Sequence, residues 1–211
     1  MKFNNSALHR PKEEKKMKKA LIILLVVVMV VTSASMVFAG RPDFAGPPAN
    51  GPGQALPPGG DSIAAIAIGA GFSELVGALV YVDGELGTDL VGLFSEGTEQ
   101  YTVFAPTNEA FEALYEEFDV EGIEELGGAL GAELIRDVLF YHVAEGRRAA
   151  NSVVPRVRDR SIITLQGASF SVSNGGIITD LAGQEAEIVA PNISASNGII
   201  HVIDTVLLPL P

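Results

Sequence analysis

The residues of this chain best suited to chemistry are two histidines in its C-terminal half, His142 and His201. Asp204 follows His201 three positions later, so a serine could complete a Ser-His-Asp triad for hydrolysis. The chain has no G-x-S-x-G motif, the sharp turn that exposes a nucleophilic serine in many hydrolases. We therefore expect no catalytic residues and no enzymatic activity.

The sequence does not contain the residue patterns that several other common chemistries need. The chain contains no cysteine, which removes thiolate catalysis, zinc–thiolate sites and iron–sulfur clusters. GAGFSE at 69–74 shares two glycines with a dinucleotide-binding fingerprint but lacks the third. EEFDVEGIEE at 116–125 offers carboxylates for calcium, yet it lacks the pattern of an EF-hand loop. A solvated charged face is the favoured interpretation and a calcium site the alternative, so we expect no metal and no cofactor.

The N-terminal segment has the pattern of an export signal. A basic start precedes a long apolar run, and Val37 and Ala39 fit the small-residue positions before a signal-peptidase site. We predict a signal peptide at residues 1–39, with Met17 as an alternative start of translation. A retained membrane anchor at Ala20–Phe38 is the alternative, because its 19 mostly apolar residues approach the length that spans a bilayer.

Removal of residues 1–39 changes the charge of the protein. It takes away seven cations and two acids, so the formal net charge falls from −12 to −17, and every remaining cation is an arginine. Binding to nucleic acid depends on neutralising phosphates with lysine and arginine, so nucleic acid is excluded as a partner. Anionic membranes are unfavourable partners for the same reason, whereas solubility is favoured.

The remaining sequence divides into a linker and one domain. Residues 40–60 hold six prolines and six glycines, a composition typical of a flexible spacer. Residues 61–211 form the predicted domain. Its first part has apolar residues at helical spacing, whereas its last third has short β-branched runs separated by Gly, Asn or Pro. This order predicts an α+β domain with a small sandwich core.

The stretch YTVFAPTNEAFEAL at 101–114 joins the two patterns. Its β-rich run, Thr102–Ala105, meets Pro106, which ends a strand because it has no N–H to donate. Thr107 can then cap a helix that buries Phe111 and Leu114. We expect a buried strand followed at once by an amphipathic helix.

With this stretch and two later ones, the sequence resembles the fasciclin family, whose modules are often called FAS1 domains. LIRDVLFYHVAEG at 134–146 and NGIIHVIDTVLLP at 197–209 follow the first box in the order typical of that family. The resemblance implies a β-sandwich wedge of short antiparallel strands with a helical layer. It also implies secretion or surface display, an adhesive or matrix-binding role, and no catalysis.

The resemblance also points to particular residues. The structural signature positions are Thr102, Phe104, Pro106, Thr107, Asn108, Phe111, Asn197, Gly198, His201 and Asp204. The segment that binds integrins in animal members corresponds here to Leu139, Tyr141, His142 and Val143, our candidate binding residues. Structural hydrogen bonding is the favoured interpretation of Tyr141 and His142, with recognition the alternative, and of His201, with metal ligation the alternative. The family's Asp-Ile pair reads Asn192–Ile193 here, so an integrin-type contact would lack its acid.

We predict a secreted or surface-displayed, non-enzymatic module for adhesion or matrix binding. Its partner would be a cell-surface or matrix polymer or protein. The alternative is a carrier that holds a small apolar ligand, such as a pigment or lipid, between helices and sandwich, because the fold alone does not settle the function. The protein would be extracellular, and an uncleaved N-terminal segment would retain it at the surface. Cleavage would leave no stable membrane span.

Overall fold

The computed structural model describes residues 60–210. The predicted signal peptide, the alternative anchor and the predicted linker up to residue 59 lie outside these residues. The helices are α2 (Ile63–Gly69), α3 (Ser73–Leu86), α4 (Leu90–Glu96), α5 (Asn108–Phe118), α6 (Ile123–Leu130), α7 (Ala132–Tyr141) and α8 (Ala150–Val153). The strands are β1 (Tyr101–Pro106), β2 (Val143–Glu145), β3 (Arg160–Ile163), β4 (Ser169–Val172), β5 (Ile177–Thr179), β6 (Glu185–Ala195) and β7 (Gly198–Ile203).

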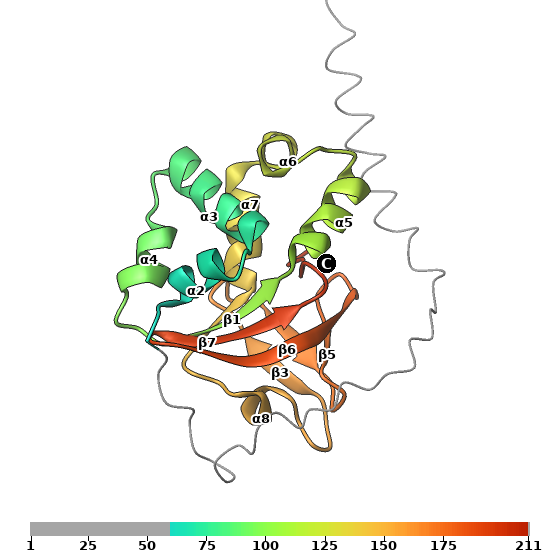
Figure 1. Cartoon of the computed structure of the whole chain (residues 1–211). Helices are drawn as coiled ribbons and strands as arrows, with labels where there is room; N and C mark the ends of the chain where they lie inside the picture. Colours follow the sequence, from blue (N-terminus) through green and yellow to red (C-terminus); the bar gives the residue numbers. More distant parts are fainter. Residues whose placement is uncertain (1–59, 211) are drawn as a thin grey trace, which may run out of the picture. The chain divides into compact units, whose positions relative to one another are not determined.

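The strands form one seven-stranded sheet in the order β2-β1-β7-β6-β5-β4-β3. Figure 1 shows α2 to α7 together on one side of β1 and β7, and α8 on the opposite side. The predicted α+β class is therefore confirmed. Neighbouring strands are antiparallel as expected, except that β1 and β7 run parallel. These two strands lie about 90 residues apart in sequence, so no turn signal could have indicated their direction.

The sheet bends at β6, which is long enough to pair with β5 near one end and β7 along the other. Its register with β7 shifts twice between Ile188 and Ile193, and Asn192 there adopts φ 68°. Such bulges bend a strand and increase its twist. The two edges of the sheet come together where the Leu165 N–H donates to the Val143 carbonyl at 2.7 Å.

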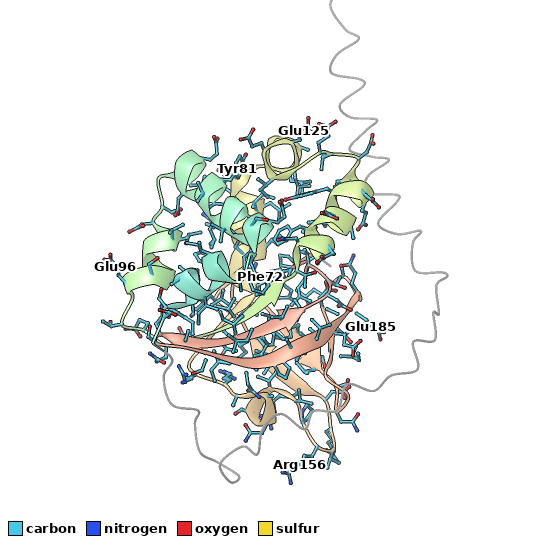
Figure 2. The ribbon with its side chains drawn as sticks, viewed as in Figure 1. Phe72, Tyr81, Glu96, Glu125, Arg156 and Glu185 are labelled. Atoms are coloured by element: carbon cyan, nitrogen blue, oxygen red, sulfur yellow. The ribbon has the colours of Figure 1, made fainter. Side chains whose placement is uncertain are left out.

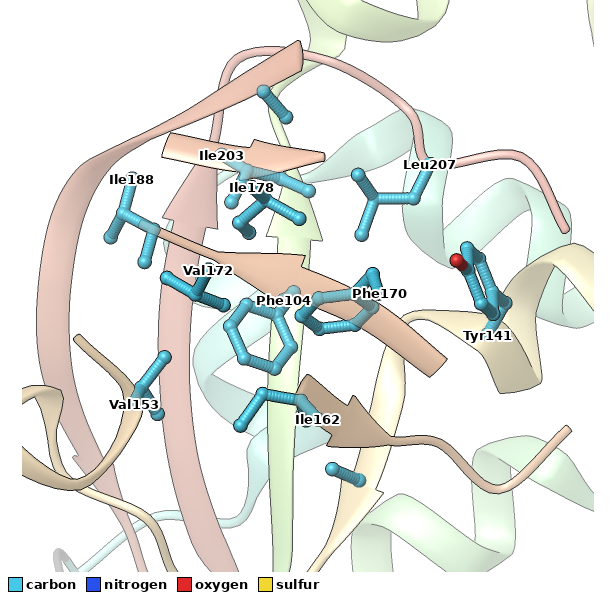
Figure 3. Packing of buried hydrophobic residues seen from close by; sticks show 12 residues of the cluster. Phe104, Tyr141, Val153, Ile162, Phe170, Val172, Ile178, Ile188, Ile203 and Leu207 are labelled. Atoms are coloured by element: carbon cyan, nitrogen blue, oxygen red, sulfur yellow. The ribbon is translucent and has the colours of Figure 1, made fainter. Parts of the chain in front are cut away.

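The bent sheet encloses the first hydrophobic core (Figure 3). Phe104 of β1 is fully buried there and meets Phe170 of β4 edge to face, with ring centroids 4.9 Å apart. Aliphatic side chains from the other strands fill the remaining space: Ile162, Val172, Ile178, Ile188 and Ile203. This interior is the small sandwich core expected from the β-branched runs.

The helical layer buries the other face of β1 and β7. Every residue of both strands is buried, because one face packs into the sandwich and the other against helices. The predicted strand-to-helix junction is confirmed: the Thr107 hydroxyl accepts the Ala110 N–H at 3.2 Å and caps α5. Phe111 of α5 is 4% exposed, as expected for the buried stripe of this helix.

Helices α4, α6 and α8 were not expected from the sequence. Helix α3 continues to Leu86, and α4 begins at Leu90. Asp89 caps α4 by accepting the Gly92 N–H at 3.0 Å, and the Asp83 carboxylate of the preceding helix adds to the cap by accepting the N–H groups of Leu90 and Val91 at 2.7 and 3.0 Å. Helix α6 covers part of the acidic stretch, and its two internal glycines obscure the helical pattern.

Candidate binding surfaces

Tyr141, in the predicted binding segment, ends α7 and lies inside the molecule. Its side chain is fully buried, its hydroxyl donates to the Ser169 carbonyl at 3.2 Å, and its ring meets Phe170 edge to face. Burial, together with the nearby Asp180 carboxylate, raises the pKa of the Tyr141 hydroxyl to about 12. Tyr141 therefore joins α7 to the sandwich core as a neutral hydrogen-bond donor.

His142 is also buried, and backbone groups occupy both of its ring nitrogens. The Leu207 N–H donates to Nε2 at 2.9 Å, so Nδ1 carries the proton and donates to the Val138 carbonyl at 2.8 Å. Burial lowers the pKa of the imidazole to about 4, which keeps it neutral at pH 7. His142 thus connects the end of α7 to the C-terminal segment of the domain.

Leu139 and Val143 flank this pair and are buried as well, with 6% and 4% exposure. A macromolecule cannot contact the Tyr141 ring in this conformation. Leu139, His142 and Val143 do line an apolar groove beneath α2, shared with residues of α3, α4 and β1. The predicted binding role of this segment stays a prediction.

The groove is small and almost purely apolar. Its cavity volume is about 40 Å³, and its lining residues from α2 to α4 and β1 are Ile63, Ala64, Ala67, Ile68, Leu75, Val76, Leu79, Val91, Phe94 and Val103. Ile68 is 63% exposed. A second apolar groove, of about 30 Å³, lies between α5, α6, α7 and the C-terminal segment.

His201 and Asp204 do not form a catalytic pair. The Asn192 N–H donates to His201 Nδ1 at 3.3 Å, so Nε2–H donates to the Arg148 carbonyl at 2.9 Å. The Asp204 carboxylate instead accepts the Glu187 N–H at 2.7 Å. Burial lowers the pKa of His201. Both side chains fasten backbone segments, and within residues 60–210 the imidazole is hydrogen-bonded to backbone groups rather than to a serine.

The polar signature residues fasten the helical layer and the loops to the sheet. Thr102 Oγ1 donates to the Gly146 carbonyl at 2.6 Å and accepts the Arg148 N–H at 2.9 Å. Asn108 accepts the Glu74 N–H at 3.2 Å and donates to the Gly71 carbonyl at 2.9 Å. The Asn108 side chain therefore connects the start of α5 to the α2–α3 turn.

Asn197 and Gly198 hold α2 against β7. Asn197 Oδ1 accepts the Ile63 N–H at 2.8 Å, and its amide donates to the Phe94 carbonyl at 2.9 Å. A Cβ on Gly198 would collide with the Tyr101 carbonyl oxygen and the Ile63 side chain. Pro106 pairs with Ile203 at the end of the parallel β1–β7 ladder.

The charges of the domain are strongly segregated. Residues 60–135 contain sixteen Asp and Glu residues and no lysine, arginine or histidine. Residues 136–210 contain six arginines and seven acids. Five of those arginines lie within residues 147–160: Arg147, Arg148, Arg156, Arg158 and Arg160. The net charge noted from the sequence hid this division, although a count along the chain could have found it.

Figure 2 shows Arg156 at the end of the domain opposite Glu125 of α6, with Glu96 of α4 at the side between them. Arg147 is engaged by carbonyl groups of Ala195 and Gly198 at 2.8 and 2.6 Å, so it is a structural cation. Burial lowers its pKa.

Within residues 60–210, no group of three or more His, Asp or Glu residues could hold a metal ion. In the same range, no helix is long and apolar enough to cross a membrane.

Comparison with known proteins places these features in context. A family model described as "Fasciclin domain" matches residues 71–209. The "Immunogenic protein MPB70" of Mycobacterium bovis is 32% identical over 179 residues, which cover 84% of this chain and 84% of that protein. The "Cell surface glycolipoprotein MPB83" of the same organism is 31% identical over 178 residues, covering 84% of this chain and 74% of that protein. A solved FAS1 domain pair from the insect cell adhesion molecule fasciclin I is 19% identical, with a TM-score of 0.49, over 69% of this chain and 47% of that chain.

Proposed function

This chain belongs to the fasciclin family, and from that premise we propose that it is a surface-displayed, non-enzymatic module that binds a polymer or protein outside the cell. The resemblance seen in the three sequence boxes is confirmed by the family match. Display at the cell surface or in its surroundings is supported by the relative named a cell surface glycolipoprotein.

The observation that carries the proposal is the position of the two imidazoles. Both histidines of residues 60–210 are buried, and backbone groups occupy both ring nitrogens of each. A general base needs a ring nitrogen within reach of a substrate proton, which neither ring offers here. The domain is then best suited to binding, and a single module gains useful adhesion by clustering on a surface.

Adhesion can be tested with beads coated with the purified protein and mixed with cells of the producing organism, with and without calcium. Beads coated with heat-unfolded protein and beads coated with another acidic protein of similar charge serve as controls. We expect clustering only with the folded protein. The absence of clustering under every condition would contradict the proposal.

A small-ligand carrier is the second candidate, and the apolar groove beneath α2 is the observation that favours it. The groove volume of about 40 Å³ is well below that of a cavity of about 150 Å³ that admits benzene. In this conformation it could hold only one end of a pigment or lipid. The adhesive role is therefore the better supported of the two.

The carrier role makes its own prediction. Val76 of α3 lines the groove, whereas Val80 of the same helix is 57% exposed and lies outside it. If an apolar ligand co-purifies, Val76→Phe should remove it from the mass spectrum of an organic extract and Val80→Phe should not. Equal ligand content in both variants, or no ligand in the wild type, would count against the carrier.

A further inference from the structure

The loop between α8 and β3 presents cations at the end of the domain opposite Glu125 of α6 (Figure 2). We define the arginine tip as Arg156, Val157, Arg158 and Arg160, all of them exposed. Only one acid, Asp159, lies within residues 147–160. Figure 2 shows Arg156 at the extremity of this pole.

The guanidinium groups of Arg156 and Arg158 are unused by the fold. Neither forms a hydrogen bond or ion pair with another residue of 60–210. The neighbouring arginines differ, because Arg160 donates to the Ser152 carbonyl and Arg148 donates to the Glu145 carbonyl. Two unpaired guanidinium groups are therefore available to an external anion.

The base of the loop is fixed, so the tip has a defined position. Val153 and Pro155 are buried beneath it. The α8 helix is attached to β6 where the Ala150 N–H donates to Asn192 Oδ1 at 2.7 Å. A partner would thus pay little conformational entropy for ordering the backbone that carries the two arginines.

The composition of the tip indicates what it would bind. Arginine presents a planar fork of N–H donors that matches carboxylate and phosphate groups. Val157 lies between the two unpaired arginines and is 83% exposed, which adds an apolar contact suited to the face of a sugar ring. One exposed valine offers too little apolar surface to insert into a membrane, and two unpaired cations are too few for nucleic acid.

We propose that the arginine tip binds an acidic polysaccharide through its carboxylate or similar anionic groups. This inference rests on the proposed surface-binding function and names its site and the chemistry of its partner. Binding at this pole keeps the polyanion at the opposite end of the domain from Glu125 of α6 (Figure 2). Because the Debye length is about 8 Å at physiological ionic strength, exposed carboxylates farther than this from the tip repel the polyanion only weakly.

The test uses the purified full protein with polygalacturonate as the probe and its methyl ester as a neutral control, in buffer with EDTA. We expect binding to the acid form only, weakened by added NaCl. Exposed ion pairs contribute modestly, so Arg156→Gln together with Arg158→Gln should raise Kd about tenfold. A variant with lysine at both positions keeps the charges and should lose less affinity for polygalacturonate.

Arg136→Gln is the matched control for each single variant, because it removes one positive charge from α7 outside the tip. Its Kd should stay at the wild-type value, while Arg156→Gln and Arg158→Gln each weaken binding. Equal Kd values for tip and control variants would overturn the proposal. So would equal binding to the acid and the ester, or no binding of polygalacturonate at low salt.

Further arms separate this inference from the proposed function and from other partners. If beads coated with wild-type protein and with the tip variant adhere to cells equally, the proposed role of the arginine tip is wrong and the adhesive function stands. If wild-type beads adhere to nothing, the proposed function fails by itself. Two other results would also overturn the proposal, provided that binding of polygalacturonate does not depend on the tip. One is tip-dependent binding to anionic lipid vesicles, and the other is tip-dependent self-association measured by sedimentation.

Discussion

Protonation of His142 should make the domain less stable in mild acid. The imidazole has a pKa of about 4 in the folded protein, against 6.5 for an unperturbed histidine, because the ring is buried. Between these two values the unfolded chain binds a proton that the folded protein does not. The contribution of His142 to the free energy of unfolding is therefore fully present above pH 6.5. It falls as the pH decreases and levels off below pH 4.

The size of the effect follows from the difference between the two pKa values. Each pKa unit corresponds to 1.36 kcal/mol, so His142 should cost the fold about 3 kcal/mol between pH 7 and pH 4. The structure explains the loss: protonated Nε2 could no longer accept the Leu207 N–H. An imidazolium would also be an unpaired charge in a buried site.

The assay is urea unfolding followed by circular dichroism at several pH values, for the wild type and His142→Gln. The variant should be less stable than the wild type at pH 7, because glutamine reproduces the two backbone hydrogen bonds imperfectly. The free energy of unfolding of the wild type should fall by about 3 kcal/mol relative to that of the variant on acidification to pH 4, since only the wild type carries the titrating ring. Every other acid and His201 are present in both proteins, so their contributions cancel.

Parallel stability profiles for the two proteins would refute the reasoning. A direct check is the NMR titration of the His142 ring protons, which should stay at their neutral positions down to about pH 5. A ring that titrates near pH 6.5 would mean that the buried geometry does not hold in solution.

Four further changes test other parts of the fold, each by chemical or thermal unfolding. Thr107→Ala should cost about 1 kcal/mol by removing the cap of α5, and Thr107→Ser should restore most of it; equal stability would contradict the cap. Phe111→Ala should cost roughly 3–5 kcal/mol by emptying a core site, and an unchanged midpoint would argue against its burial. Gly198→Ala should cost roughly 1–3 kcal/mol because its Cβ meets the Tyr101 carbonyl, whereas Gly128→Ala in α6 has open space and should be neutral or stabilising. Added NaCl should raise the thermal midpoint by screening the acidic helical layer, and a flat response would show that its self-repulsion is negligible.

Part of the fold could be predicted from the sequence because it depends on residues that are close together in the chain. The junction at Pro106 and Thr107 was predicted correctly, because strand termination and helix capping depend on residues that are adjacent in the chain. The strands of the last third were also predicted, since β-branched runs between turn residues carry their own signal. Helix α4 was missed because part of its cap comes from Asp83 in the preceding helix.

The site depended on contacts that no local pattern encodes. The sequence identified Tyr141 and His142 as notable and left exposure and burial as alternatives. Their burial follows from packing against Phe170 and from a hydrogen bond with Leu207, 65 residues further along the chain. The parallel pairing of β1 with β7 likewise joins segments that are distant in sequence.

The sequence by itself determined the family, the α+β class and the segregation of charge, because these are properties of residue type and order. Only the tertiary structure decided which charged groups remain available. Arg147 and Arg160 look like Arg156 and Arg158 in the sequence, yet the first two are engaged by backbone carbonyls and the last two are not. The distinction arises because hydrogen-bond partners are set by the folded path of the backbone rather than by the identity of the side chain.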